Sequence, residues 1–151
     1  VLQQALLNKK NIALIRVYDQ EPIRLTAVED QIRQVFINLI INAGDAMTPH
    51  GGTLTLTTER GETEAVVTVA DTGPGISAEN LDHIFEPFFT TKAAVEGTGL
   101  GLPVSYGIVH GHGGAIEVGS IPGKTEFRVR LPLSGTARPL GAAANEVYPR
   151  G

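Results

Sequence analysis

Three polar side chains follow one stripe of a segment that is otherwise apolar. Asn38, Asn42 and Asp45 are separated by four and three residues, a spacing that brings them to one side of a helix. Asparagine and aspartate are unfavourable inside helices, so their position at the border of an apolar face needs a reason. Two interpretations stay open: a solvated polar edge, or a polar floor for a ligand, where amide oxygens suit Mg²⁺ and phosphates.

A second candidate site begins where a predicted strand ends. Asp71 is followed by Thr72-Gly73-Pro74-Gly75-Ile76, and a carboxylate followed by glycines is typical of a pocket rim, because glycine lets the backbone approach a ligand. A simple turn explains the same residues. An apolar strand ending in Asp-Thr-Gly also resembles an aspartic protease, which would need a homodimer to pair two carboxylates. The Pro-Gly that follows and the asparagines of the helix count against the protease.

A second glycine cluster opens a predicted helix. Backbone N–H groups and the helix dipole favour an anion at such a start, so the cluster predicts a phosphate site, with a flexible hinge as the competing interpretation. Before it, Ile84–Phe89 holds three of the five phenylalanines and must anchor on the body of the protein or on a partner. Lys92 could bring a positive charge over phosphates. The cluster consists of Gly97, Thr98, Gly99, Leu100, Gly101 and Leu102.

The elements that must position these residues follow from the periodicity of the chain. Apolar residues recur at helical spacing over Val28–Met47, and Leu100–His110 also has the length of a helix. The stretch from Asp71 to Gly97 has no sustained period and is long for a connection, which predicts a functional loop or lid. Predicted strands are Ile12–Tyr18, Pro22–Thr26, Thr53–Glu59 and Ala65–Ala70, with a final hairpin of Ala115–Gly119 and Thr125–Leu131. This order predicts an α/β fold, an α+β two-layer sandwich with a mixed β-sheet packed under helices.

Length and composition exclude several classes of protein. A chain of 151 residues with 42% apolar residues suits one domain with a real core. The absence of cysteine excludes disulfides, thiolate zinc sites and cysteine nucleophiles. A net charge of −4 argues against binding to nucleic acid, and no apolar run reaches the length of about 18 residues needed to span a bilayer. His110 and His112 lack a third ligand and are interpreted as structural.

Four segments in this order resemble the ATP-binding catalytic domain of bacterial sensor histidine kinases, within the wider family of gyrase, MutL and heat-shock chaperone ATPases. The resemblance covers residues 11–133. Four ordered boxes are far more specific than any one of them, and the sequence Glu-Pro-Phe-Phe-Thr-Thr-Lys is most like the nitrogen-regulation and dicarboxylate-sensor branch. The segments are the N box Gln34–Ala46, the first glycine box Asp71–Ile76, the F box Ile84–Lys92 and the second glycine box Gly97–Leu102.

The resemblance implies a role for each box in binding ATP and Mg²⁺. Asp71 would accept a hydrogen bond from the adenine amino group, Asn42 would ligate Mg²⁺, and Asn38 would support the triphosphate. Asn38 and Lys92 are the implied catalytic residues, with Lys92 contacting a phosphate. The glycines would shape the pocket wall, bind phosphates and hinge a mobile ATP lid. The implied nucleotide-binding residues are Asn38, Asn42, Asp45, Asp71, Gly73, Gly75, Ile76, Lys92, Gly97, Thr98, Gly99, Leu100, Gly101 and Leu102.

Position 38 distinguishes two activities within this family. The gyrase-like hydrolases carry a glutamate there that activates water, whereas this chain has Asn38, and an amide cannot accept that proton. The resemblance therefore implies phosphoryl transfer by a protein-histidine kinase. The four histidines precede Gly or Ile and none resembles the substrate histidine, so the chain alone should bind ATP without autophosphorylation. The competing functions are a related ATPase, an anti-sigma-type serine kinase, a non-catalytic ATP sensor and, least favoured, the dimeric protease.

The resemblance also implies partners, a location and domain limits. The partners would be the kinase's own dimerisation and histidine-phosphotransfer domain and the receiver domain of a response regulator. The full-length protein would be a homodimer and this chain a monomer, in the cytoplasm, with or without a membrane anchor on the parent protein. Residues 1–10 are interpreted as the remnant of a helical hairpin, residues 11–133 as the ATP-binding domain, and residues 134–151 as a flexible tail, a linker or a cloning remnant.

Overall fold

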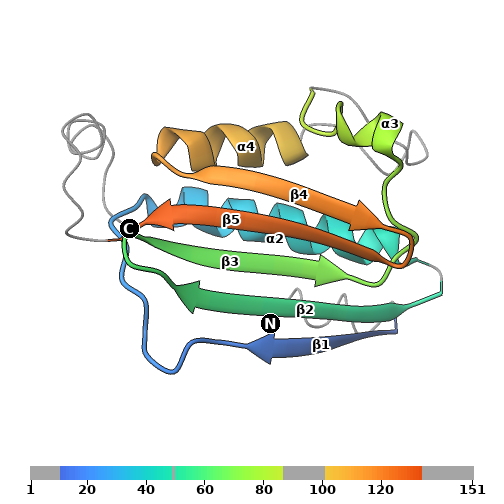
Figure 1. Ribbon diagram of the computed structural model, residues 1–151, viewed down its shortest axis with the longest axis horizontal. Helices are drawn as coiled ribbons and strands as arrows, with labels where there is room; N and C mark the ends of the chain where they lie inside the picture. The colour runs from blue at the N-terminus through green and yellow to red at the C-terminus, as the bar shows by residue number, and fades with distance from the viewer. Residues whose placement is uncertain (1–10, 49, 87–100, 134–151) are drawn as a thin grey trace.

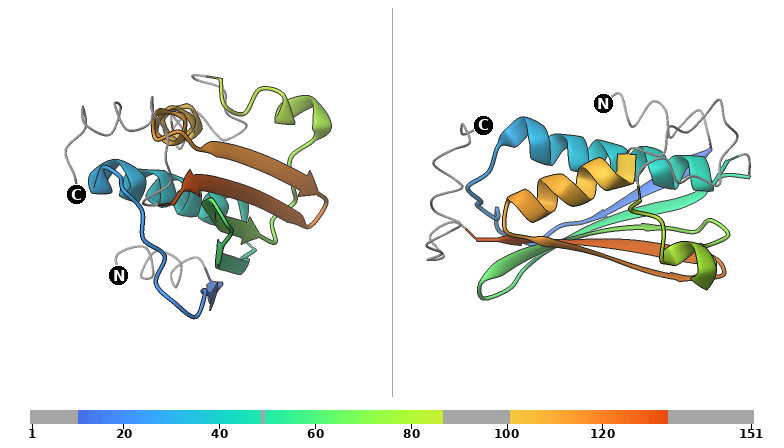
Figure 2. Two further views of the ribbon diagram at one scale, coloured as in Figure 1. Left: turned by 60° about the vertical axis from the view of Figure 1, so that its left-hand side comes forward. Right: turned by 90° about the horizontal axis from the view of Figure 1, so that it is seen from above.

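The computed structural model describes residues 11–48, 50–86 and 101–133, which form two layers (Figures 1 and 2). One layer is a five-stranded sheet with the order β1-β2-β3-β5-β4, and helices α2 and α4 cover one of its faces. β1 pairs with β2 in parallel and all other pairs are antiparallel, so the sheet is mixed, as predicted. The strands are β1 Ile12–Val17, β2 Gly52–Arg60, β3 Glu64–Asp71, β4 Ala115–Ile121 and β5 Lys124–Pro132, and the helices are α2 Glu29–Ala46, α3 Ala78–Leu81 and α4 Gly101–Gly111.

The segment Pro22–Thr26 is not a strand, so this prediction is wrong. Because β1 and β2 are parallel, the chain between them must cross from one end of the sheet to the other, and α2 makes that crossover. The chain leaves the sheet at Asp19, whose N–H donates to Thr58 Oγ1 (2.9 Å) and whose Oδ2 accepts from the N–H of Arg60 (3.0 Å). The segment therefore leads into the helix layer, where Leu25 packs against the core.

One short helix interrupts the stretch after Asp71 for which the sequence predicts no regular element. Helix α3 has four residues, and Ser77 caps it by accepting the N–H of Asn80 at 3.2 Å. A single helical turn is too short to produce an apolar period, so only its cap could have indicated it.

The core lies between α2 and the sheet, and the buried positions along α2 recur with the helical period that the sequence predicted. Every fourth residue from Val35 on α2 to Met47, the C-cap residue of that helix, is at most 2% exposed. These side chains belong to one buried cluster with residues of β2, β3, β5 and α4. The members from α2 and its C-cap are Val35, Leu39, Ala43 and Met47, and their partners in the cluster include Leu54, Val69, Val109, Phe127 and Val129.

A buried histidine joins the end of α4 to the beginning of α2. His112 is 8% exposed, its Nδ1 lies 2.8 Å from the carbonyl oxygen of Ile108, and its Nε2 accepts the N–H of Val28 at 3.1 Å. Val28 is the N-cap residue of α2 and has no side-chain cap of its own. The imidazole thus satisfies one of the helix's unpaired N–H groups, which agrees with the structural role predicted for His112.

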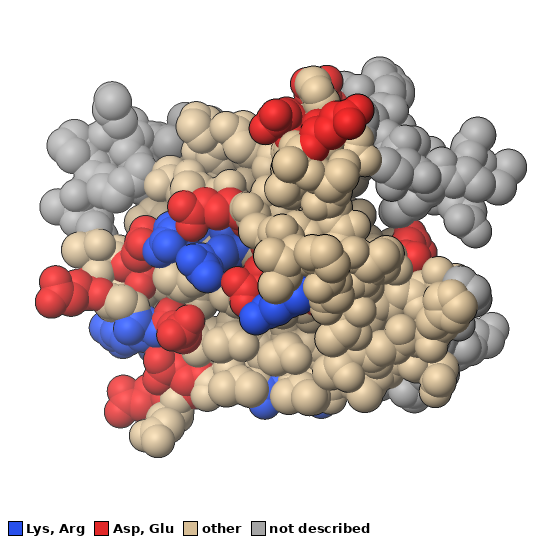
Figure 3. All heavy atoms as spheres, turned by 45° about the vertical axis from the view of Figure 1, so that its right-hand side comes forward, with Lys and Arg blue, Asp and Glu red and all other residues tan. Residues whose placement is uncertain are grey.

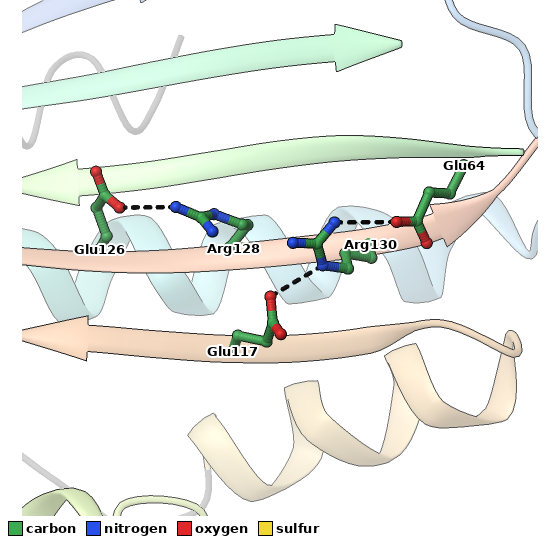
Figure 4. Close-up of polar contacts among 5 residues, drawn as sticks. All are labelled: Glu64, Glu117, Glu126, Arg128 and Arg130. Atoms are coloured by element: carbon green, nitrogen blue, oxygen red, sulfur yellow. Dashed lines mark hydrogen bonds and ion pairs between the residues drawn. The ribbon is translucent and has the colours of Figure 1, made fainter. Parts of the chain in front are cut away.

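The outer face of the sheet is polar. Arg130 donates to Glu117 and to Glu64, both at 2.9 Å, and Arg128 donates to Glu126 at 3.2 Å (Figure 4). Basic and acidic side chains lie next to one another on one part of this face (Figure 3). Exposed ion pairs of this kind contribute little to stability, so they mainly keep this side of the sheet soluble. A hollow of about 320 Å³ lies among them, lined by Thr57, Glu59, Val66, Thr68, Glu126, Arg128 and Arg130.

Candidate functional site

Asp71 is a buried carboxylate at the end of β3. Its side chain points to the helix layer, since it pairs in register with buried Leu54 and Thr125, and it is 3% exposed. Oδ1 accepts the N–H of Gly73 at 2.9 Å. Burial raises the pKa of Asp71, and the hydrogen bond from Gly73 lowers it by a smaller amount. Among the described residues it forms no ion pair, so this carboxylate retains capacity to accept hydrogen bonds from a ligand.

The raised pKa of Asp71 predicts how stability depends on pH. The folded state disfavours the ionised carboxylate. The free energy of unfolding therefore falls as pH rises from the pKa of the unfolded chain, near 3.8, through the higher pKa of the folded protein. We expect Asp71→Asn to be more stable than the wild type at pH 7, without nucleotide, and the difference to shrink towards pH 4. Urea unfolding of both proteins across this range measures it. A difference that is constant with pH would contradict the prediction.

The first glycine box passes closely between α2 and β4. A Cβ on Gly73 would lie 3.0 Å from the carbonyl oxygen of Ala46, the last residue of α2, and 3.0 Å from Asp71 Oδ1. Gly75 has φ +92°, and a Cβ there would lie 2.6 Å from the carbonyl oxygen of Ile121. Ile76 donates its N–H to Ser120 Oγ at 2.7 Å. A side chain at position 75 would therefore clash with β4, and one at position 73 would require its neighbours to shift slightly. The loop is held at both ends.

The polar stripe of α2 is half-buried, with Asn38, Asn42 and Asp45 all intermediate in exposure. Asn38 contacts α4: its Nδ2 donates to the carbonyl oxygen of Gly101 and to Ser105 Oγ, each at 3.1 Å. Its Oδ1 accepts from Gln34 Nε2 at 2.7 Å. The side chain of Asn42 has no hydrogen bond to any other residue of the described segments. No residue of the described segments therefore competes with a ligand for the side-chain amide of Asn42.

The two glycine boxes contact the same helix at different points. Gly73 lies beside Ala46, and Gly101 lies beside Asn38. The eight residues between these points correspond to about 12 Å of helix, and Asn42 lies midway along it. Helix α2 therefore contacts one glycine box near each end of this stretch, with Asn42 between the two contacts.

Some predicted residues lie outside the described segments. They are Lys92, Gly97, Thr98, Gly99 and Leu100, and their roles remain predictions. Of the second glycine box the structure describes Gly101, which is exposed, and Leu102, which packs partly buried against the core. Ile76 of the first box is also partly buried against the core.

The start of the F box is anchored on the body of the protein. The ring of Phe85 lies 5.2 Å from that of Tyr106 on α4 and 6.3 Å, edge to face, from that of Phe127 on β5. Such aromatic pairs stabilise beyond their buried area. Of the two predicted anchors, the body of the protein or a partner, Phe85 contacts the body. The box from residue 87 onward lies outside the described segments.

Several polar residues of the site were not singled out by their sequence. Ser105, Ser120 and Thr72 bind Asn38, the N–H of Ile76 and the N–H of Thr53, respectively. The one available signal was a serine four residues after Gly101 in an otherwise apolar helix. No cluster of three metal-ligating side chains occurs in the residues described. None of the helices described is long and apolar enough to cross a membrane.

The comparison with known families decides what this arrangement is. The family described as "Histidine kinase-, DNA gyrase B-, and HSP90-like ATPase" matches residues 27–135, more than half of the chain. The chain belongs to this family. The matched range includes the N box on α2 and the first glycine box after β3, and the binding roles of their residues remain predictions.

Curated proteins similar to this chain include sensor histidine kinases. The sensory histidine kinase/phosphatase NtrB of Klebsiella oxytoca is 38% identical over 133 residues, covering 82% of this chain and 38% of NtrB. NtrB agrees with the predicted nitrogen-regulation branch, although the sensor histidine kinase ZraS of Escherichia coli reaches 44% identity over 76% of this chain and 24% of ZraS. The chain spans 20% to 38% of the length of the curated relatives it matches.

Solved structures of the family have the same fold. The catalytic domain of histidine kinase ThkA is 36% identical with a TM-score of 0.78, and the match covers 87% of both chains. Full-length ShkA, solved in complex with AMPPNP, is 27% identical with a TM-score of 0.77, covering 90% of this chain and 29% of ShkA. The predicted fold class and the resemblance to histidine kinase catalytic domains are confirmed. These matches favour neither an aspartic protease nor an anti-sigma-type serine kinase.

Proposed function

We propose that this domain binds ATP with Mg²⁺ and positions the γ-phosphate for transfer to a histidine on a dimerisation domain outside the chain. The observation that carries the proposal is Asp71, buried without an ion pair among the described residues and bound by the single N–H of Gly73. A buried carboxylate of this kind has a high desolvation cost. An amino group of adenine would offset that cost, since it donates where the carboxylate still accepts.

The residues described also fit a magnesium ion that is shared with phosphates. Asn42 Oδ1 is a hard oxygen ligand, and this amide lies between the two glycine boxes with no competing hydrogen bond in the described segments. Mg²⁺ is commonly held by one or two protein oxygens together with substrate phosphates and water, so one amide ligand is sufficient. Bound there, the ion would neutralise charge that develops on the phosphates.

The chemistry favours transfer to a protein over hydrolysis. Asn38 stands where the gyrase-like hydrolases carry the acid that activates water, and an amide has no basic atom that could take a proton from water. What this domain contributes is position: adenine held at Asp71 and phosphates along α2, with the γ-phosphate accessible to an imidazole nitrogen in line with the bond that breaks. ShkA, a relative bound to AMPPNP, supports a nucleotide in this fold.

The whole protein's partners and location belong to the same proposal. The histidine would come from the kinase's own dimerisation domain, and the phosphoryl group would pass to the receiver domain of a response regulator. The full-length protein would act as a homodimer with this domain in the cytoplasm, where ATP is available. Similarity to NtrB supports a sensor kinase of the nitrogen-regulation branch.

Two measurements test the proposal. Calorimetric titration with ATP, with and without Mg²⁺, must show saturable binding, and its absence in a folded protein would refute the nucleotide site. The separately purified dimerisation domain is then added with ATP labelled at the γ-phosphate. Transfer to a label that is acid-labile and base-stable identifies phosphohistidine. An acid-stable label would indicate a serine kinase, and no label would indicate an ATP sensor.

The role of Asn42 gives a separate prediction. Asn42→Ala removes the proposed protein ligand of Mg²⁺, so ATP affinity in the presence of Mg²⁺ should fall about tenfold, while affinity in EDTA changes little. Calorimetry under both conditions measures the two affinities. An equal loss with and without Mg²⁺ would show that Asn42 contacts the nucleotide directly.

A further inference from the structure

We propose that Ser105 is a positioning residue for nucleotide binding, acting through Asn38. The inference rests on the proposed function, because it concerns the same ATP site. Ser105 lies in the second turn of α4, is 0% exposed, and bonds both to Asn38 and to the carbonyl oxygen of Gly101. It thereby joins the N box to the last glycine of the second glycine box.

The hydrogens of this network can be assigned from the donors and acceptors present. The Gly101 carbonyl only accepts, so the single hydroxyl hydrogen of Ser105 donates to it at 2.9 Å. Ser105 Oγ must then accept from Asn38 Nδ2. Nδ2 also donates to the same Gly101 carbonyl. Two acceptors of α4 therefore hold the amide nitrogen of Asn38.

This arrangement leaves Asn38 with only one group to offer a ligand. Its Oδ1 accepts one hydrogen bond, from Gln34, and an amide oxygen has two lone pairs. Asn38 can therefore accept from a ligand or from water on a metal ion through Oδ1, while its Nδ2 faces α4. Gly101 and Ser105 favour this orientation together, since an amide rotated by half a turn would direct its oxygen at the Gly101 carbonyl and at a Ser105 Oγ whose hydrogen is already donated to that carbonyl. Asn38 would then support the triphosphate indirectly, with its Oδ1 accepting a hydrogen bond from water bound to Mg²⁺.

Helix stability alone does not explain a serine at this position. In a regular α-helix the carbonyl of residue 101 already accepts the N–H of residue 105, so the hydroxyl is not required to satisfy it. Serine is also a poorer helix former than alanine. The bond that serine adds, and that alanine would lose, is the bond to Asn38.

A double-mutant cycle tests whether Ser105 acts through Asn38. ATP affinity is measured by calorimetry, with Mg²⁺ and in EDTA, for the wild type, Ser105→Ala, Asn38→Ala and the double variant. We expect Ser105→Ala to weaken affinity about fivefold with Mg²⁺ and less than twofold in EDTA. In the Asn38→Ala background the same substitution should have no further effect.

Thr48→Ala is the matched control. Thr48 Oγ1 donates to the carbonyl oxygen of Gly44, four residues earlier in the chain, at 2.8 Å, which is the same bond that Ser105 makes to Gly101. We expect this variant to bind ATP as the wild type does. If Ser105→Ala unfolds below the assay temperature, Ser105→Cys replaces it with the same expectations, because a thiol fills similar space and hydrogen-bonds weakly.

The outcomes separate this inference from the proposed function. A folded wild-type protein that does not bind ATP would refute the function itself. Wild-type binding together with equal losses from Ser105→Ala in both backgrounds would overturn the role of Ser105 alone. The role of Ser105 would also be overturned if Ser105→Ala bound ATP as the wild type does, or if it lost as much affinity in EDTA as with Mg²⁺.

Discussion

Asp71→Ala should lower the affinity for ATP by about 10²-fold or more. The substitution removes a charged acceptor from a nearly closed environment, and hydrogen bonds to charged groups are among the strongest single contributions to binding. The adenine amino group would then be buried without its partner, which adds a desolvation penalty. Calorimetric titration with Mg²⁺-ATP measures the loss, and affinity within threefold of the wild type would remove the adenine assignment.

Two controls distinguish recognition of adenine from a general effect of charge. Glu62→Ala removes one negative charge from the exposed loop between β2 and β3 and should bind ATP normally. Wild-type protein should also prefer ATP to GTP, because guanine carries an oxygen where adenine carries its amino group, and that oxygen would face the carboxylate of Asp71. In Asp71→Ala this preference should disappear along with the affinity.

Local features of the site could be predicted from the sequence because each is encoded in a short segment. The apolar period of α2 fixes which side of that helix is buried, and the same period places Asn38, Asn42 and Asp45 at its border. Likewise a strand that ends in Asp71 and is followed by glycines indicates close backbone approach, which Gly73 and Gly75 show.

What could not be predicted depends on contacts between distant segments. The parallel pairing of β1 with β2 joins segments that are far apart in the sequence. Because of this pairing, Pro22–Thr26 belongs to the connection that leads from β1 to the crossover helix α2 and forms no strand. The bond between Asn38 and Ser105 joins residues 67 apart in sequence, and no local pattern identifies a partner at that distance. The hydrogen bond from the N–H of Val28 to His112 Nε2 joins residues 84 apart, and no local pattern could predict it either.

Gly75→Ala should cause the second large effect, on both stability and binding. The residue has φ +92°, where an L side chain is strained, and the added Cβ would lie 2.6 Å from the carbonyl oxygen of Ile121. The strain and the clash together should lower the free energy of unfolding by about 2–4 kcal/mol. Urea unfolding without nucleotide measures this loss.

Gly75→Ala should also weaken ATP binding, because it displaces the loop, and this effect can be measured separately from the loss of stability. The loop is held on one side by the N–H of Ile76 bound to Ser120, and on the other by Gly73 against Ala46. Moving residue 75 away from β4 displaces the backbone that orients Asp71, so affinity should fall more than about tenfold even where the variant is folded. Gly107→Ala is the matched control, because no atom lies within 4 Å of a Cβ there. Alanine in that helix should be neutral or stabilise by up to about 1 kcal/mol, so equal behaviour of the two variants would show that the close approach at Gly75 does not shape the site.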